Sequence, residues 1–256
     1  INKTIYQNAY VRTDSYFDNS PLASSGLPSK EELELLNVWK DQIPAEVFTE
    51  TFIPPVTDGS GNDRKNLLKA KEILEKEGWF VENGKLIKDG KEFKFEFLIV
   101  SPSDEKIALA YQSNLKKLGI TMDVRTVDSS QYQERLLSYD FDMIKRYWGV
   151  SLSPGNEQQF YWGSEVGQKD GSRNYPGINS PAVDAMIEKL INAENREELT
   201  TAIHALDRIL LWGHYVIPLY HSNKDRMAYW DFFEYPDEIP LYGIVIESWW
   251  INKDKQ

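Results

Sequence analysis

The sequence predicts an α/β fold built on a mixed, partly parallel sheet. Helical and strand patterns alternate between residues 103 and 148, which is typical of βαβ units. Short extended runs surround Asn83-Gly84 and Asp89-Gly90, two pairs that favour the positive φ of tight hairpin turns. Two long amphipathic patterns after Ser180 indicate helices that cover a core.

The first quarter of the chain is expected to be mostly extended loop. Pro, Ser and Gly recur between residues 18 and 63, and only residues 30–36 carry a short helical pattern. Beyond this segment, apolar residues follow a helical spacing up to Gly78, which suits a C-terminal cap. A helix is therefore expected over 63–77.

The Asn-Gly and Asp-Gly pairs separate three extended runs. In the last of these runs Phe93, Phe95 and Phe97 alternate with charged residues, a pattern that buries one face of a strand. The three runs predict a small antiparallel meander.

Helices and strands alternate in the middle of the chain. Helices are expected over 103–118 and up to Leu137, the second capped by Ser129 or Ser130. Strands are expected over 120–124 and 141–148. Strand, helix and strand at this spacing predict a βαβ unit.

Two helices near the C-terminus have the clearest end signals. Ser180 precedes Pro181, a pair that suits a cap and a first helical position, and Asn195 with Glu198 resembles a capping box. Each helix carries one apolar stripe. Further short strands are expected at 216–220, 226–230 and 244–246.

Composition and charge exclude several classes of function. The 256 residues include 40 acidic and 29 basic side chains, a net charge of −11, which excludes nucleic acid as the main partner. No apolar run approaches the ~20 residues that cross a bilayer. The absence of Cys removes disulfides and thiolate catalysis. Because the chain begins at Ile1, we expect it to be a processed or excised piece.

Catalytic signatures are scarce, so no enzyme is expected. No Gly-rich phosphate motif follows a strand, and the three histidines lack zinc-site spacing. Residues 149–153 only approach the nucleophile elbow G-x-S-x-G. Carboxylate pairs such as Asp140 and Asp142 arise freely among so many acidic residues. No cofactor and no metal are expected.

The segment 141–175 carries the candidate ligand-binding residues. Cations, amides, hydroxyls and aromatic rings follow a strand whose carboxyl end would face the crevice of an open α/β sheet. This mixture suits a polar, extended ligand such as a peptide. Composition alone favours equally an ordinary core of rings with surface cations. The candidates are Lys145, Arg146, Trp148, Ser151, Ser153, Asn156, Glu157, Trp162, Arg173, Asn174 and Tyr175.

Several stretches, in their order and spacing, resemble a known family across nearly the whole chain. They include Tyr10–Phe17, Gly26–Ser29, Val127–Gln133, Tyr139–Ile144, Leu152–Gln158, Gly171–Tyr175, Ala205–Arg208 and Trp249-Trp250. In them the chain resembles the C-terminal half of the peptide-type, family 5 solute-binding proteins of bacterial ABC importers. Within that family it is most similar to the branch associated with microcin-C-like peptide uptake.

The resemblance implies a mixed-sheet lobe of a type II periplasmic-binding-protein clamshell. Residues 1–256 would be the C-terminal lobe, with about 231–256 returning to an N-terminal lobe outside this sequence. The protein would be periplasmic and non-catalytic, and would deliver peptides or peptide-like compounds to an ABC permease. The alternative from another class is an extracellular glycan-binding or glycoside-active domain, in which Trp148, Trp162 and Tyr175 stack on sugar rings.

One departure from the family pattern concerns the ligand's amino terminus. Well-known oligopeptide binders place an Asp three residues after the Trp of the strand-end motif, where this chain has Ser151. The family arginine that reaches the ligand aligns with Lys145, and Arg146 follows it. The resemblance thus implies a cationic strand end without the carboxylate that holds an ammonium group.

Overall fold

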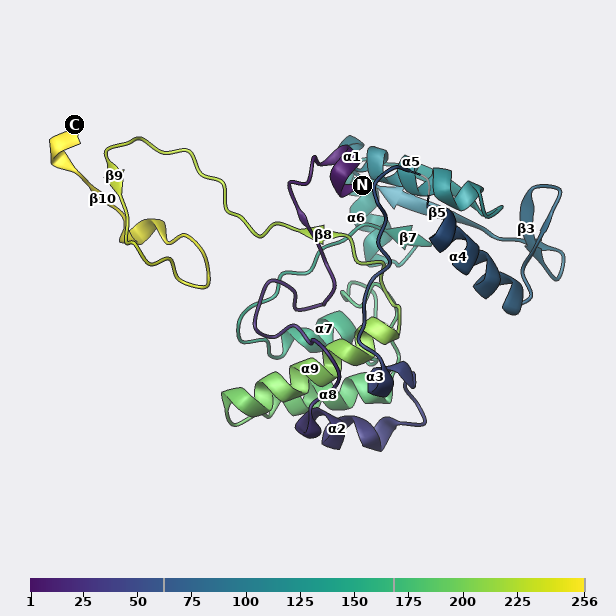
Figure 1. Ribbon diagram of the computed structural model, residues 1–256, viewed down its shortest axis with the longest axis horizontal. Coiled ribbons are helices and arrows are strands. Elements are labelled where there is room, and N and C mark those ends of the chain that lie inside the picture. Colours follow the sequence, from purple (N-terminus) through teal and green to yellow (C-terminus); the bar gives the residue numbers. More distant parts are fainter. Residues whose placement is uncertain (62, 168, 256) are drawn as a thin grey trace.

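Three parts make up the structure, a computed structural model that describes residues 1–61, 63–167 and 169–255. A sheet layer contains β5, a helical layer contains α8 and α9, and a C-terminal arm extends away from both (Figure 1).

The sheet layer is built on three parallel strands in the order β6-β5-β7. The central strand β5 (Lys94–Ile99) pairs with β6 (Thr121–Thr126) on one side and with β7 (Met143–Ile144) on the other. The connecting helices are α5 (Pro102–Lys116) and α6 (Ser129–Leu137), the latter capped by Asp128 rather than by a serine. The expected alternation and the partly parallel sheet are confirmed.

The meander is antiparallel as expected, but it ends earlier. It contains β2 (Phe80–Glu82), β3 (Lys85–Lys88) and β4 (Lys91–Glu92), and α4 (Arg64–Lys76) precedes it. The run that contains Phe93, Phe95 and Phe97 is not a strand of the meander and instead forms, from Lys94 on, β5 of the parallel sheet. The reason is burial on both faces: Phe97, Leu98 and Ile99 are consecutive and all buried, as in a central parallel strand.

The strand expected over 141–148 is much shorter. Only β7 at 143–144 pairs with β5, whose last residue is Ile99. Because the chain beyond Ile144 soon has no facing strand to supply hydrogen bonds, it continues as a loop. This loop carries several of the candidate ligand-binding residues.

The helical layer consists of α8 (Pro181–Ile191) and α9 (Arg196–Trp212) packed against each other, with α2 (Lys30–Leu36), η1 (Asn37–Trp39), α3 (Glu46–Thr49) and α7 (Glu157–Trp162) around them. Both expected caps are present. Ser180 accepts a hydrogen bond from the Val183 N–H, and Asn195 accepts one from the Glu198 N–H. Leu206, Leu210 and Ile203 lie in the fully buried core of this layer.

The two layers meet near a two-stranded ribbon. Its strands are β1 (Val11–Arg12), which follows α1 (Asn2–Ile5), and β8 (Tyr220–His221). The strands expected at 226–230 and 244–246 do not form. Strand β8 covers only the last residue of the run expected at 216–220.

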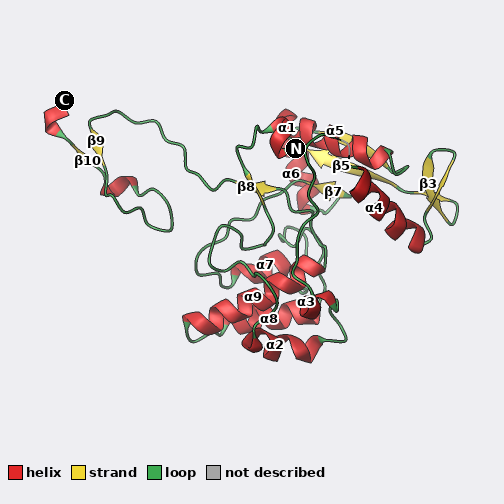
Figure 2. Cartoon of the chain, viewed as in Figure 1, coloured by secondary structure: helices red, strands yellow, loops and turns green. Residues whose placement is uncertain are grey.

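The arm, residues 222–255, contains its own small hairpin of β9 (Phe233–Glu234) and β10 (Trp250–Ile251), with η2 (Ile246–Ser248) and η3 (Lys253–Lys255). It is mostly loop (Figure 2). The ring of Trp249 packs on Tyr229 at 4.9 Å and on Tyr235 at 5.0 Å between centroids. Trp230 and Leu241 are 73% and 83% exposed.

Among the residues that the structure describes, no helix combines the length and apolar character needed to span a membrane. Within the same ranges no cluster of three or more His, Asp or Glu side chains is arranged to hold a metal ion.

Candidate functional site

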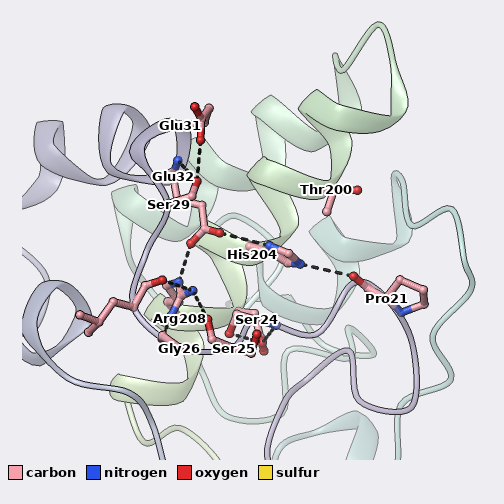
Figure 3. A network of polar contacts seen from close by, with 12 residues as sticks. Pro21, Ser24, Ser25, Gly26, Ser29, Glu31, Glu32, Thr200, His204 and Arg208 are labelled. Carbon is pink, nitrogen blue, oxygen red and sulfur yellow. Dashed lines mark hydrogen bonds and ion pairs between the residues drawn. The ribbon is translucent and has the colours of Figure 1, made fainter.

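Two consecutive residues of helix α9, Asp207 and Arg208, hold the N-terminal loop, residues 13–29, by hydrogen bonds. Arg208 donates hydrogen bonds to the carbonyl oxygens of Ser25, Gly26 and Leu27, and pairs with Glu32 at 2.6 Å. Both side chains of this ion pair are almost fully buried. His204 contacts Glu32 Oε1 at 3.2 Å (Figure 3).

Asp207 is the second residue of α9 that binds the N-terminal loop, and its side chain is wholly buried. It accepts four hydrogen bonds at 2.7 to 3.0 Å, from the Ser15 hydroxyl, the Tyr16 N–H, and the N–H and hydroxyl of Ser24. Burial raises the pKa of Asp207, against the effect of these donors. The loop therefore enters the molecule at a fixed position next to α7.

An aromatic cluster extends from this loop to the strand end that follows β7. Trp162 is 2% exposed and donates its Nε1–H to Gln158 Oε1 at 3.0 Å. The Tyr16 ring packs edge-on against the Trp162 ring, with 5.0 Å between the ring centroids. The Trp148 ring also packs against Trp162, again with 5.0 Å between centroids. The ring centroids of Trp148 and Tyr175 lie 6.4 Å apart, so the candidate residues Trp148, Trp162 and Tyr175 belong to one cluster.

The indole nitrogen of Trp148 is buried and has no hydrogen-bond partner within the described ranges. A buried donor without an acceptor costs free energy, about 1–3 kcal/mol. A carbonyl oxygen of a bound molecule, or an ordered water, would satisfy it. This atom is the strongest indication that something else completes the site.

Arg146 stands at the exposed rim of the cluster. Its guanidinium carbon lies 5.0 Å from the Tyr175 ring centroid, and Nη2 is 3.4 Å from the Tyr175 hydroxyl. Burial raises the pKa of Tyr132, and the nearby Arg146 charge opposes that shift. In the described part of the chain Arg146 pairs with no carboxylate, so its charge faces solvent unneutralised.

Lys145 is in a different situation. Its ammonium group pairs with Asp104 on the first turn of α5, with side-chain exposures of 26% and 15%, and lies 5.8 Å from the Tyr220 ring centroid. Burial lowers the pKa of Lys145, but the hydrogen bond and charge of Asp104 outweigh this and raise it. The positive charge is largely neutralised within the protein.

Asn174 is fully buried. Its amide nitrogen donates to the carbonyl oxygens of Gly163 and Ile178, and its oxygen accepts from the Ile178 N–H. All its main hydrogen-bonding positions are used within the chain, so it holds the loop around α7. The ligand contact expected of Asn174 stays a prediction.

The remaining polar candidates lie on the loop before α7 and after it. Glu157 accepts two hydrogen bonds from the Gly155 N–H, at 3.0 and 3.1 Å, and Ser151 accepts one from the Ser153 N–H at 3.2 Å. Asn156 caps α7 without a side-chain bond. Ser151, Ser153 and Asn156 are exposed, as is Arg173. Their roles toward a ligand stay predictions.

Four side chains contribute to this region although they are not among the residues predicted for it: Tyr16, Tyr132, Asp104 and Tyr220. Tyr16 lies in the stretch Tyr10–Phe17, which supports the family resemblance, but no local pattern places it against α7. Only the tertiary structure brings these side chains to the strand end.

Comparison with known proteins gives consistent findings. A family model described as bacterial extracellular solute-binding proteins, family 5 middle, matches residues 1–170. The uncharacterized protein y4wM of Sinorhizobium fredii is 48% identical over 253 residues, which are 98% of this chain and 38% of that protein. The probable peptide-binding protein YejA of Agrobacterium fabrum is 41% identical, with 99% and 42% covered.

A solved structure shares the fold. The oligopeptide-binding protein AppA from Bacillus subtilis, in complex with a nonapeptide, matches with a TM-score of 0.64 at 20% identity, covering 98% of this chain and 44% of that one. The chain thus spans about two fifths of the length of the curated relatives it matches.

Proposed function

The chain belongs to the bacterial extracellular solute-binding proteins of family 5, and from this premise we propose that it is the C-terminal lobe of the peptide-binding component of an ABC importer. The protein would bind peptides or peptide-like compounds in the periplasm and deliver them to a membrane permease without chemical change. One relative is named as a probable peptide-binding protein and one structural neighbour is an oligopeptide-binding protein in complex with a nonapeptide, which supports this choice of ligand.

The observation that carries the proposal is the unpaired indole N–H of Trp148 beside Arg146 and Tyr175. A peptide offers a carbonyl acceptor at every residue and a carboxylate at its end. The Trp148 N–H would donate to a backbone carbonyl, and Arg146 would pair with a carboxylate. Charge-assisted hydrogen bonds of this kind are the stronger ones in binding sites.

The three cations predicted from the sequence divide into two roles. Lys145 is neutralised by Asp104, so we assign it to holding α5 against the strand end. Arg146 and Arg173 are exposed and have no carboxylate partner in the described ranges. They would provide the positive potential that an otherwise acidic protein presents to an anionic ligand.

The C-terminal arm would be completed by a second lobe. Its rings pack mainly on one another, and Trp230, Leu241 and Tyr242 remain largely exposed. A segment of this size cannot bury enough apolar surface to fold alone. We propose that residues 231–256 pack on the other lobe, which closes over the ligand.

Calorimetry on the full-length protein tests the proposal. The probes are mixed-sequence peptides, from tripeptides to nonapeptides, and neutral oligosaccharides at matched concentration. Peptide binding that weakens when Arg146 is changed to Gln supports the proposed function. Binding of oligosaccharides alone would instead favour a glycan-binding protein, and would overturn it.

A further inference from the structure

We propose that Asp207, which lies in the helical layer, is a positioning residue for Trp148 at the ligand face and acts through Tyr16 and Trp162. The proposal rests on the proposed function, because it assigns Trp148 to the ligand. It adds a buried carboxylate whose hydrogen bonds reach none of the predicted ligand-binding residues directly. Three contacts in sequence connect Asp207 to Trp148.

The first contact fixes the backbone of Tyr16. Asp207 Oδ1 accepts the Tyr16 N–H at 2.8 Å, while Oδ2 accepts from Ser15 and Ser24. Asp207 is fully buried on α9, in a close-packed core. Because a buried carboxylate with four donors has one favourable orientation, it fixes where the Tyr16 Cα lies.

The second contact transfers this position to Trp162. The Tyr16 ring meets the Trp162 ring edge-on, at 5.0 Å between centroids and an interplanar angle of 89°. A second restraint on the Trp162 ring is the hydrogen bond that its Nε1–H donates to Gln158 Oε1. A ring that is 2% exposed and held on two sides has little freedom to change rotamer.

The third contact reaches the ligand face. The Trp148 ring packs most closely on Trp162, at 5.0 Å between centroids, and more loosely on Tyr175, at 6.4 Å, and its backbone belongs to the loop that follows β7. Its indole N–H has no partner among the described residues, so none of their hydrogen bonds sets the direction of the ring. The position of Trp148 therefore depends on Trp162 and, one step back, on Tyr16.

A neighbouring fastening supplies a matched control. Glu32 is also a buried carboxylate, and it pairs with Arg208, the residue after Asp207. Arg208, held by Glu32, donates to the same N-terminal loop further along, at residues 25–27, and among the described residues the Glu32 carboxylate has no hydrogen bond or ion pair to the aromatic cluster. Glu32→Gln and Asp207→Asn both replace a buried carboxylate by an amide, so general loss of stability is common to both.

The experiment uses the full-length protein labelled with 5-fluorotryptophan. The fluorine signals of Trp148 and Trp162 are assigned with Trp148→Phe and Trp162→Phe. They are then followed, without ligand, in Asp207→Asn, Tyr16→Leu and Glu32→Gln. Tyr16→Leu removes the ring contact but keeps the backbone bond to Asp207, and it tests the proposal if Asp207→Asn does not fold. Affinity for the best peptide from the calorimetric screen is measured in parallel.

We expect Asp207→Asn and Tyr16→Leu to move or broaden both tryptophan signals and to weaken peptide affinity by about threefold to thirtyfold. Glu32→Gln should lower the melting temperature and leave the Trp148 signal in place. An unchanged Trp148 signal in both test variants, or an equal change in Glu32→Gln, overturns the proposal. Because the fluorine signals need no ligand, failure of peptide binding in the native protein would reject the proposed function while Asp207 is still tested.

Discussion

Arg146 lies over the ring of Tyr175, with its guanidinium carbon 5.0 Å from the ring centroid. Such a cation–π contact at an exposed site contributes about 0.5–1 kcal/mol and orients the guanidinium without neutralising it. Lys145, one residue earlier, instead forms an ion pair with Asp104 that neutralises its charge. Two adjacent cations thus have opposite environments, and each leads to a prediction.

Replacing Arg146 by Gln should weaken binding of an anionic peptide to the full-length protein by about tenfold or more, since charge-assisted hydrogen bonds are worth ~1.5–3 kcal/mol. The melting temperature should fall by only a few degrees, because the contact with Tyr175 contributes no more than about 1 kcal/mol. Calorimetry at two salt concentrations measures the effect, and Arg64→Gln, on an exposed cation at the start of α4, is the control. Equal affinity of the native protein and the Arg146 variant would show that the guanidinium does not touch the ligand.

Replacing Lys145 by Met should destabilise the fold by about 1–3 kcal/mol, because it leaves the poorly exposed Asp104 carboxylate without its partner. The measurement is urea unfolding. In Lys145→Met with Asp104→Asn, most of the loss should be recovered, since the unpaired charge is gone. If the double variant is as unstable as the single one, the ion pair is not the cause.

Glu32 should make the stability of the protein sensitive to acid. Burial raises the pKa of Glu32, but hydrogen bonds and charge from His204 and Arg208 outweigh it and hold the pKa below its usual value. A depressed carboxyl pKa stabilises the fold above about pH 4.3, and the contribution is lost as the pH falls through the lower folded-state value. Thermal unfolding from neutral pH to pH 3 should show a smaller acid loss in Glu32→Gln than in the native protein. Parallel curves would contradict this.

Because Ser151 stands where well-known oligopeptide binders have an Asp, a free amino group on the peptide ligand should not be required for tight binding. A serine hydroxyl accepts one hydrogen bond but cannot neutralise an ammonium charge, and an unpaired buried ammonium would cost several kcal/mol. Acetylating the amino end of a bound peptide should therefore reduce affinity for the full-length protein by less than about tenfold, or ~1.4 kcal/mol. A larger loss would place a carboxylate near that end of the ligand.

Deleting residues 231–256 from the 256-residue chain should leave its unfolding midpoint nearly unchanged. The aromatic contacts of Trp249 and the hydrogen bonds of Glu234 all lie within the arm. In the full-length protein the same deletion should lower stability if the arm packs on a second lobe. Equal effects in both proteins would argue against that packing.

Local patterns in the sequence determined much of the fold. The caps at Ser180 and Asn195 and the apolar stripes behind them placed α8 and α9 nearly to the residue. Asn83-Gly84 and Asp89-Gly90 adopt the positive φ that hairpin turns require. These signals are short-range, so the sequence contains them directly.

The strands were harder, because a strand exists only if a neighbour pairs with it. Residues 141–148 have the composition of a strand, yet only Met143 and Ile144 pair with β5. The arm pairs Phe233 with Ile251, across a loop that no periodic pattern marks.

The same distinction divides the candidate site. The sequence by itself determined that cations and large rings gather after β7, because that is a property of neighbours along the chain. Only the tertiary structure decided that Lys145 is neutralised by Asp104, that Asn174 is buried, and that the Trp148 N–H has no acceptor within the part of the chain that the structure describes. Burial and partnership depend on residues far apart in the chain, and these set the free energy of a charge or a hydrogen-bond donor.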